Sequence, residues 1–219
     1  MSQIAIDGPA GAGKSTIARR VAAQMGYIYV DTGAMYRAMA LFMLREGVEL
    51  SDEAAVAAAS ERAEITIRHE GGEQVVVLNG EPVNGLIRTE EVSKAASAVS
   101  VYPPVRARLL TLQRRLGEEN DVVMDGRDIG TVVLPKAECK IFLTASAAVR
   151  AHRRYLELTG RGEEADEAQI LKDIEARDAQ DSTRAVAPLK QAEDATLVDT
   201  SELSIEEVTE TILNICRGR

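Results

Sequence analysis

Short apolar runs alternate with longer amphipathic stretches along most of the chain. The apolar runs have the length of β-strands and lie at residues 3–6, 28–30, 121–124, 140–143 and 196–198. Helical spacing of apolar side chains covers residues 13–25, 34–45, 147–158 and 167–181. A last helix is predicted after Ser204, where Glu207 completes a capping box. Because strands that alternate with helices form parallel sheets covered on both faces, the pattern predicts an α/β fold.

One region departs from this rhythm and predicts a small antiparallel insert. Residues 64–70 alternate between apolar and polar, and residues 74–78 are rich in β-branched side chains. Glycine-containing turn sequences follow both runs, so we interpret residues 64–85 as a β-hairpin insert on the α/β core. A second irregular stretch, residues 159–166, contains two glycines and several charges. It is either a solvated loop or a mobile lid.

Composition and charge exclude several classes of function. With 219 residues, of which 45% are apolar and 28% charged, the chain has the size and composition of one globular domain. Its formal net charge of −9 and its lack of tryptophan disfavour binding to nucleic acids or anionic membranes. Neither a membrane span nor a signal peptide is evident, so we expect a cytoplasmic protein. Cys139 and Cys216 are expected to be unpaired, buried apolar side chains.

The strongest chemical signal is a phosphate-binding loop between the first predicted strand and the first predicted helix. Residues 8–15 read GPAGAGKS and match G-x-x-x-x-G-K-[ST] in full. Backbone N–H groups of such a loop point at phosphate oxygens, and the start of the helix adds partial positive charge. Lys14 is then expected at the β- and γ-phosphates, and the Ser15 hydroxyl at Mg²⁺. The sequence therefore predicts binding of a nucleoside triphosphate.

Polar residues also follow two other predicted strands, at the sheet edge where parallel α/β folds bind ligands. Residues 31–37 read DTGAMYR; Thr32 is predicted to cap the next helix and Arg37 to lie about one turn in, although both can serve structure alone. Residues 125–128 read DGRD, in which opposite charges either bind a ligand or form a surface ion pair of little value.

Arginines gather on two predicted helices of this otherwise acidic chain. Arg177, Asp181 and Arg184 share one helix face if the predicted helix continues to Arg184, a spacing more often used for a salt-bridge ladder. A second set shares a face of the preceding helix: Arg150, Arg153 and Arg154. Because arginine suits bidentate recognition of phosphate, these clusters indicate local binding of anions.

Together with three further segments, these motifs resemble those of bacterial-type cytidylate kinases. GPAGAGKS, DTGAMYR, KAASAVS, VRARLL, DGRDIGTVV and RDAQDSTRAVAPL follow one another as in that family, and the resemblance runs over about residues 3–217. It implies one P-loop kinase domain over residues 1–219, with a five-stranded parallel sheet flanked by helices. It also implies a monophosphate-binding region at about 32–117, which holds the insert at about 64–85, and a lid at about 150–184.

The resemblance implies transfer of a phosphoryl group from ATP to CMP or dCMP, with Mg²⁺, and assigns roles to individual residues. The ATP-binding set comprises Gly8, Pro9, Ala10, Gly11, Ala12, Gly13, Lys14, Ser15, Thr16, Arg153 and Arg154. Contacts to the acceptor phosphate fall on Thr32, Tyr36, Arg37, Arg127 and Arg184. Contacts to the cytosine fall on Ser97, Arg106 and Asp128, to the sugar on Asp181, and to the nucleotide on Arg177. The catalytic set is Lys14, Arg127 and Arg184, and Ser15 is the metal ligand.

The assignment of the cytosine contacts agrees with the chemistry of the base. Cytosine offers an amino donor, which the Asp128 carboxylate can accept, and two acceptors, which Arg106 and Ser97 can satisfy. Two departures from the family stand out: Gln180 takes the place of a common arginine, and Ser15 the place of a common glycine. The second leaves the phosphate-loop pattern intact.

Two alternative functions remain open from the sequence. One is a P-loop kinase for another nucleoside monophosphate or a small metabolite, which would not need a base-reading pair such as Arg106 and Asp128. The other is a switch protein that hydrolyses nucleotide slowly, for which no switch loop or partner surface is evident. We expect a monomer whose ligands are ATP and CMP or dCMP, without nucleic-acid or membrane partners.

Overall fold

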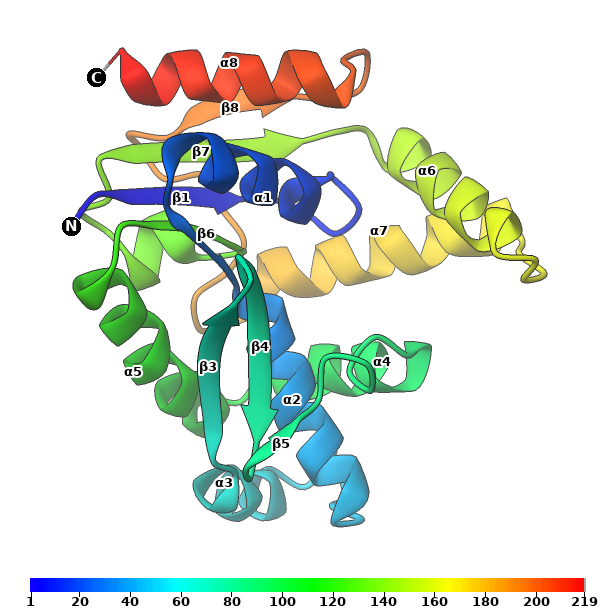
Figure 1. Ribbon diagram of the computed structural model, residues 1–219. Coiled ribbons are helices and arrows are strands. Elements are labelled where there is room, and N and C mark those ends of the chain that lie inside the picture. Colours follow the sequence, from blue (N-terminus) through cyan, green and yellow to red (C-terminus); the bar gives the residue numbers. More distant parts are fainter. Residues whose placement is uncertain (219) are drawn as a thin grey trace.

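The computed structural model describes residues 1–218 and is drawn in Figure 1. Within these residues, five parallel strands form the central sheet in the order β2-β6-β1-β7-β8. Their bounds are β1 Gln3–Asp7, β2 Ile28–Asp31, β6 Val122–Gly126, β7 Cys139–Thr144 and β8 Thr196–Asp199. All five coincide with the predicted apolar runs to within two residues at either end. The predicted α/β fold with a five-stranded parallel sheet is confirmed.

Four helices lie where apolar periodicity predicts them: α1 Lys14–Met25, α2 Thr32–Arg45, α6 Ala147–Gly160 and α7 Glu167–Thr183. The helix predicted after Ser204 is α8 Ile205–Arg217. The predicted capping box is present, because Ser204 and Glu207 each bond to the other's main-chain N–H. The structure adds three helices that the pattern did not predict: α3 Glu53–Arg62, α4 Glu90–Val99 and α5 Pro103–Glu119. It also adds a short π-helix, η1 Ile129–Val133.

The insert is a separate three-stranded antiparallel sheet, formed by β3 Ile65–Glu70, β4 Glu73–Leu78 and β5 Glu81–Pro82. The glycine-containing turns join its strands as expected. Gln74 of β4 fastens this sheet to the central one. Its side-chain oxygen accepts from the Asp31 N–H at 2.8 Å, and its amide donates to the Asp31 carbonyl at 3.2 Å. The insert therefore abuts the carboxyl end of β2.

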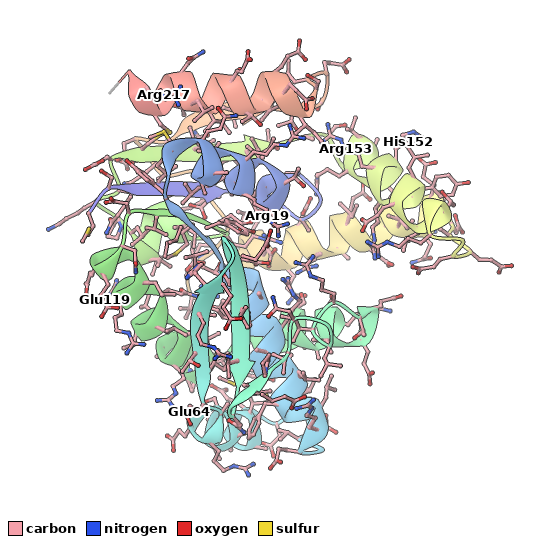
Figure 2. All side chains as sticks on the ribbon, in the orientation of Figure 1. Arg19, Glu64, Glu119, His152, Arg153 and Arg217 are labelled. Atoms are coloured by element: carbon pink, nitrogen blue, oxygen red, sulfur yellow. A yellow bond between two sulfur atoms is a disulfide. The ribbon has the colours of Figure 1, made fainter. Side chains whose placement is uncertain are left out.

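Two apolar cores lie on opposite faces of the central sheet, and side chains fill both spaces (Figure 2). Alternation along β1 divides its residues between them, because Ile4 and Ile6 join one core and Ala5 the other. The first core packs α1 and α8 against the sheet, and the second packs α2 to α5 and the insert against the other face. None of the helices in residues 1–218 is both long and apolar enough to cross a membrane.

Cys139 and Cys216 form a disulfide with a Cα–Cα distance of 5.4 Å, so the prediction of unpaired cysteines was wrong. Cys139 begins β7 and Cys216 lies in the last turn of α8. They are 77 residues apart in sequence, and α8 brings them together by packing along β7. Spacing along the chain gives no sign of this contact.

Candidate active site

The phosphate-binding loop lies between β1 and α1 and requires glycine at its first position. Gly8 has a φ of 151°, and a Cβ there would lie 1.9 Å from the Leu143 carbonyl oxygen. The loop closes on Lys14, which is buried and donates from Nζ to the Pro9 carbonyl at 2.7 Å. Burial, with a further contribution from the charge of Arg127, lowers the pKa of Lys14 to about 7. A negatively charged ligand at the loop would therefore stabilise the charged form of Lys14.

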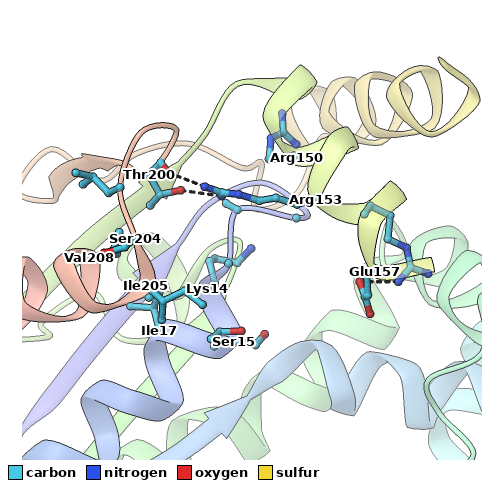
Figure 3. Close-up of a pocket in the computed structure, with 16 residues that line it drawn as sticks. Lys14, Ser15, Ile17, Arg150, Arg153, Glu157, Thr200, Ser204, Ile205 and Val208 are labelled. Carbon is cyan, nitrogen blue, oxygen red and sulfur yellow. Dashed lines mark hydrogen bonds and ion pairs between the residues drawn. The ribbon is translucent and has the colours of Figure 1, made fainter. Parts of the chain in front are cut away.

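A cavity of about 610 Å³, here called the donor cavity, opens beside this loop (Figure 3). Its floor is the start of α1, including Lys14 and Ser15, and α8 supplies Ile205 and Val208 on one side. Arg153 of α6 donates to the Thr200 hydroxyl at 3.1 Å and to the Thr200 carbonyl at 2.6 Å. Eight predicted ATP-binding residues line the cavity: Gly11, Ala12, Gly13, Lys14, Ser15, Thr16, Arg153 and Arg154. Gly8 and Pro9, at the start of the loop, line neither this cavity nor the second pocket, and Ala10 lines the second pocket.

Arg150 has a different position from the neighbouring arginines of α6. It is buried and forms a two-bond ion pair with Asp178 of α7, at 2.5 and 3.2 Å. It also donates to the Ala10 carbonyl of the phosphate-binding loop at 2.9 Å. By contrast, Arg154 pairs with the exposed Glu157. Arg150 therefore connects α6 and α7, the two helices of the predicted lid, to the phosphate-binding loop.

A second pocket of about 260 Å³, here called the acceptor pocket, is lined by residues from the loop, α2, α4, α5, the end of β6 and α7. All ten residues predicted to bind the acceptor line it: Thr32, Tyr36, Arg37, Ser97, Arg106, Arg127, Asp128, Arg177, Asp181 and Arg184. The acceptor pocket shares Gly11, Lys14 and Ser15 with the donor cavity. The two spaces therefore meet at the lysine of the phosphate-binding loop.

Ion pairs order the predicted base-reading side of the acceptor pocket. Arg106 donates to Asp128 at 2.5 Å, and its guanidinium lies 5.5 Å from the centre of the Tyr36 ring. Arg127 donates to Asp181 at 2.8 Å. Burial opposes ionisation of Asp181, but the charges of Arg127, Arg177 and other neighbours outweigh it and lower the pKa of this carboxyl. The Asp181 carboxylate is therefore held charged in a buried setting.

Three cationic nitrogens in the acceptor pocket are buried without a hydrogen-bond partner within residues 1–218: Arg37 Nε, Arg177 Nε and Arg184 Nη2. Such atoms are uncommon in folded proteins, because an unsatisfied buried donor is costly. Burial and nearby arginines lower the pKa of both Arg177 and Arg184. The pocket thus has an excess of buried positive charge, which a multiply charged anion would compensate.

Thr32 does not cap α2, contrary to the prediction. Asp31 is the cap, since its Oδ1 accepts from the Ala34 N–H at 2.9 Å. Thr32 is the first residue of the helix, and its hydroxyl donates to the Asp125 carbonyl at 2.7 Å. Asp31 Oδ2 accepts from Arg37 at 2.8 Å, so Arg37 is oriented by a neighbour rather than solvated.

Asp125 completes a small oxygen site beside Ser15. Its carboxylate accepts from the Ser15 hydroxyl at 3.0 Å and from the Tyr29 hydroxyl at 2.9 Å. Burial, with the nearby charge of Asp31, raises the pKa of Asp125 to about 6. A hydroxyl and one carboxylate fit Mg²⁺ that takes its other ligands from phosphate and water. Within residues 1–218, no group of three or more His, Cys, Asp or Glu could hold a metal by itself.

Several pocket residues were absent from the predicted site. Asp125 belongs to the DGRD motif, and its place at the end of a strand was a usable signal. Ser100 of the acceptor pocket ends the KAASAVS segment, which was likewise a usable signal. Ser93 of the acceptor pocket and Leu203 of the donor cavity had no such signal, because they lie on surfaces that only folding brings together. Gln180 lies on α7 and donates to the Ser97 carbonyl of α4 at 3.0 Å.

Solved structures support the fold independently of the site. An uncharacterized protein from Eubacterium ventriosum ATCC 27560 aligns over 100% of both chains with a TM-score of 0.55 and 12% identity. A shikimate kinase from Bacteroides thetaiotaomicron aligns over 99% of this chain and 98% of its own, with a TM-score of 0.50 and 12% identity. At such low identity these likenesses concern the fold alone.

Sequence comparison is more specific. A protein of Desulfitobacterium hafniense (strain Y51) named cytidylate kinase is 52% identical over 213 residues, which are 97% of this chain and 91% of that protein. One of Syntrophotalea carbinolica with the same name is 50% identical over 216 residues, or 99% and 92% of the two chains. The family model described as cytidylate kinase matches residues 4–218. With near-complete coverage in every case, the chain belongs to the cytidylate kinase family.

Proposed function

We propose that this phosphotransferase binds ATP in the donor cavity and CMP or dCMP in the acceptor pocket, and transfers the γ-phosphoryl group between them at Lys14. The observation that carries the proposal is the meeting of the two cavities at Gly11, Lys14 and Ser15. A donor on one side and an acceptor on the other then place their phosphates at the same cation. The products are ADP and CDP or dCDP.

In the donor cavity, the phosphates lie against the backbone of the loop and the start of α1. Gly8 to Thr16 form this cradle, and Arg153 and Arg154 approach from α6. Binding of the phosphates favours the charged form of Lys14, whose pKa burial lowers to about 7. The rest of the lining includes four apolar side chains that suit the flat face of a base: Ile17, Leu203, Ile205 and Val208.

In the acceptor pocket, the buried donors without a hydrogen-bond partner support the proposal that the acceptor phosphate binds beside them. Arg37 and Arg184 each have such a nitrogen, and Arg127, Thr32 and Tyr36 line the same pocket. Arg177 supplies another buried donor to the nucleotide. Each would complete a charge-assisted hydrogen bond to a phosphate oxygen, the strongest class of hydrogen bond in proteins.

The base is read by Asp128, Arg106 and Ser97, and the sugar by Asp181. The Asp128 carboxylate accepts from the amino group of cytosine, while Arg106 and Ser97 donate to its ring acceptors. Because Arg106 and Asp128 are already paired at 2.5 Å, the pair presents one donor and one acceptor in a fixed relation. Uracil has a carbonyl where cytosine has the amino group and would face the carboxylate with a second acceptor.

The chemistry needs positioning and charge neutralisation rather than a general base, because the acceptor is already a phosphate oxygen. Two unit charges about 4 Å apart repel by about 4 kcal/mol at an effective dielectric constant of about 20, and several such pairs must approach. Lys14, Arg127 and Arg184 offset this repulsion. Ser15 and Asp125 would hold Mg²⁺, which when bound neutralises charge on the β- and γ-phosphate oxygens.

We further propose that the protein acts as a monomer in the cytoplasm, without nucleic-acid or membrane partners. One chain supplies all residues of both proposed sites. The formal net charge of −9 opposes association with polyanionic surfaces. Closure of the lid over the site would exclude water and so limit hydrolysis of ATP.

The test is a panel of acceptors with ATP and Mg²⁺ as donor, with ADP formation as the readout. The proposal expects CMP and dCMP to support rapid turnover, UMP to do so poorly, and small hydroxylated metabolites not at all. ADP formation without any acceptor would instead favour a nucleotide-hydrolysing switch. Equal turnover of several monophosphates would contradict the assignment of the base-reading residues.

A further inference from the structure

Asp7 ends β1, one residue before the phosphate-binding loop, and contacts the segment that carries Asp128. Its Oδ1 accepts from the Ile129 N–H and its Oδ2 from the Gly130 N–H, both at 2.7 Å. These are the first two residues of the π-helix η1, which follows Asp128 directly. Asp7 is 4% exposed and lines neither the donor cavity nor the acceptor pocket. Both of its oxygens are therefore engaged by backbone, away from the proposed ligands.

The opposite end of η1 is held in the same way by an arginine. Arg114 of α5 donates to the Val132 carbonyl at 2.9 Å and, through Nε, to the Val133 carbonyl at 3.4 Å. The same helix carries Arg106, which pairs with Asp128 at 2.5 Å. Asp7 and α5 thus hold the segment from both sides.

The backbone of Asp128 is part of this turn. Its carbonyl accepts from the Val132 N–H at 2.9 Å and from the Val133 N–H at 3.1 Å, which closes the π-type turn. The first N–H groups of any helix lack partners within it, and π-helices are rare and concentrated at functional sites. A change at the Ile129 and Gly130 N–H groups therefore moves the backbone from which the Asp128 side chain projects.

A buried carboxylate is a costly way to satisfy two N–H groups. Burial raises the pKa of Asp7 to about 6, against the opposing effect of its two hydrogen bonds. A neutral residue would avoid that cost. Among short side chains, however, an ionised aspartate offers two equivalent acceptor oxygens that can each receive a separate N–H. The structure thus keeps an expensive group whose benefit is geometric.

We propose that Asp7 is a positioning residue for the acceptor base, acting through η1 to hold Asp128 in its base-reading place. Asp7 also directly precedes Gly8, so the end of β1 holds both the start of the phosphate-binding loop and the η1 turn that follows Asp128. This inference rests on the acceptor site proposed above. It assigns Asp7 no contact with either nucleotide.

The central test compares Asp7→Asn with the unchanged chain at a pH of about 8, where the Asp7 carboxyl, with its pKa of about 6, is ionised. Asparagine keeps the shape but turns an N–H donor toward one of the two backbone N–H groups. We expect the KM for CMP to rise about tenfold, and the preference for CMP over UMP to fall by a similar factor. The affinity for ATP should change less than about threefold. Any fall in Tm should be too small to account for the rise in the KM for CMP.

Two further variants separate positioning from stability. Arg114→Met removes the donors that the exposed Arg114 side chain supplies to the far end of η1, and we expect the KM for CMP to rise as in Asp7→Asn. Ser60→Ala is the matched control: Ser60 is 1% exposed, its hydroxyl donates to the Ala57 carbonyl at 2.7 Å, and it lines neither cavity. Its loss should lower the Tm without altering the CMP/UMP ratio.

The outcomes separate this inference from the proposed function. Suppose the unchanged chain prefers CMP and Asp128→Asn removes that preference. If Asp7→Asn and Arg114→Met then show the same KM for CMP and the same CMP/UMP ratio as Ser60→Ala, the positioning role of Asp7 is overturned. The proposed function still stands in that case. If the unchanged chain shows no CMP preference, or Asp128→Asn leaves it intact, the acceptor assignment fails and this inference fails with it.

Discussion

Arg106 and Asp128 form a pair across the acceptor pocket, 2.5 Å apart, in which each side chain is 9% exposed. Arg106 comes from α5 and Asp128 from the segment after β6, so the pair joins α5 to the end of a central strand. Arg184 approaches the same carboxylate at 3.6 Å. Asp128 is therefore held between two cations, with its orientation set before any ligand arrives.

Asp128→Asn should remove most of the preference for CMP over UMP. An asparagine side chain has only one acceptor oxygen, and its NH2 group is a donor that cannot pair with the cytosine amino group. A base contact of this kind is worth about 1–3 kcal/mol of discrimination. The loss should appear mainly in the kcat/KM for CMP. ATP affinity is the internal control, because Asp128 does not line the donor cavity. An unchanged CMP/UMP ratio would remove Asp128 from base recognition.

Lys14→Ala should abolish phosphoryl transfer, by several orders of magnitude in kcat, while the fold persists. Lys14 lies where the two cavities meet, and its removal also removes a buried charge. Lys140→Ala is the matched control. Lys140 is likewise buried, but it pairs with Asp194 at 2.8 Å and lines neither cavity. Near-normal turnover in Lys14→Ala would contradict the role of the loop.

Binding of ATP should take up close to one proton at a pH of about 8. In the free protein, burial and the charge of Arg127 lower the pKa of Lys14 to about 7, so the amine is mostly neutral at that pH. The phosphates favour the ammonium form and raise the pKa again. Calorimetry without Mg²⁺, in buffers of different ionisation enthalpy, measures the uptake. Lys14 should contribute nothing at a pH of about 6, and Lys14→Met should abolish the uptake at the higher pH.

Gln74→Leu should weaken the use of CMP more than the binding of ATP. Gln74 of the insert bonds to both main-chain groups of Asp31, and Asp31 in turn orients Arg37. Loss of these bonds should raise the KM for CMP about five- to tenfold. Gln191→Leu is the control, because it removes an exposed glutamine bond to the Ala195 carbonyl. Equal losses for both nucleotides would make the insert purely structural.

Cys216→Ser should lower the free energy of unfolding by about 2–4 kcal/mol under oxidising conditions. The bond to Cys139 closes a loop between positions 77 residues apart and ties α8 to β7. Urea unfolding with and without reductant measures the effect. Reductant should bring the unchanged chain to the stability of the variant. No effect of reductant on the unchanged chain would contradict a stabilising disulfide.

Local pattern was enough to predict the central sheet and the phosphate-binding loop. The strands are continuous apolar runs because they are buried on both faces, and the loop is one contiguous motif. Helices α3 and α4 were missed because their buried faces carry few large apolar side chains, Val56 in α3 and Val92 and Val99 in α4, and small residues fill the other buried positions. Helix α5 was missed although leucines line its buried face, because charged residues separate them.

The remaining features depend on contacts between distant segments. Asp31 and Thr32 are both residue types that favour the capping position. The Thr32 hydroxyl donates instead to the carbonyl of Asp125, which is distant in sequence, and Asp31 caps the helix. The contacts of Asp7 with η1 span 122 and 123 positions. The residues of the acceptor pocket came from family resemblance. Their meeting in one place is a property of the fold that no single motif encodes.

Helix α7 has a double attachment whose consequence is thermodynamic. Through Asp178 it is tied to Arg150 and so to the Ala10 carbonyl of the donor loop. Through Arg177 and Asp181 it lines the acceptor pocket. We therefore expect an adjustment of this helix that favours one nucleotide to change the affinity for the other. Linkage requires that ATP alter the affinity for CMP by the same factor by which CMP alters the affinity for ATP.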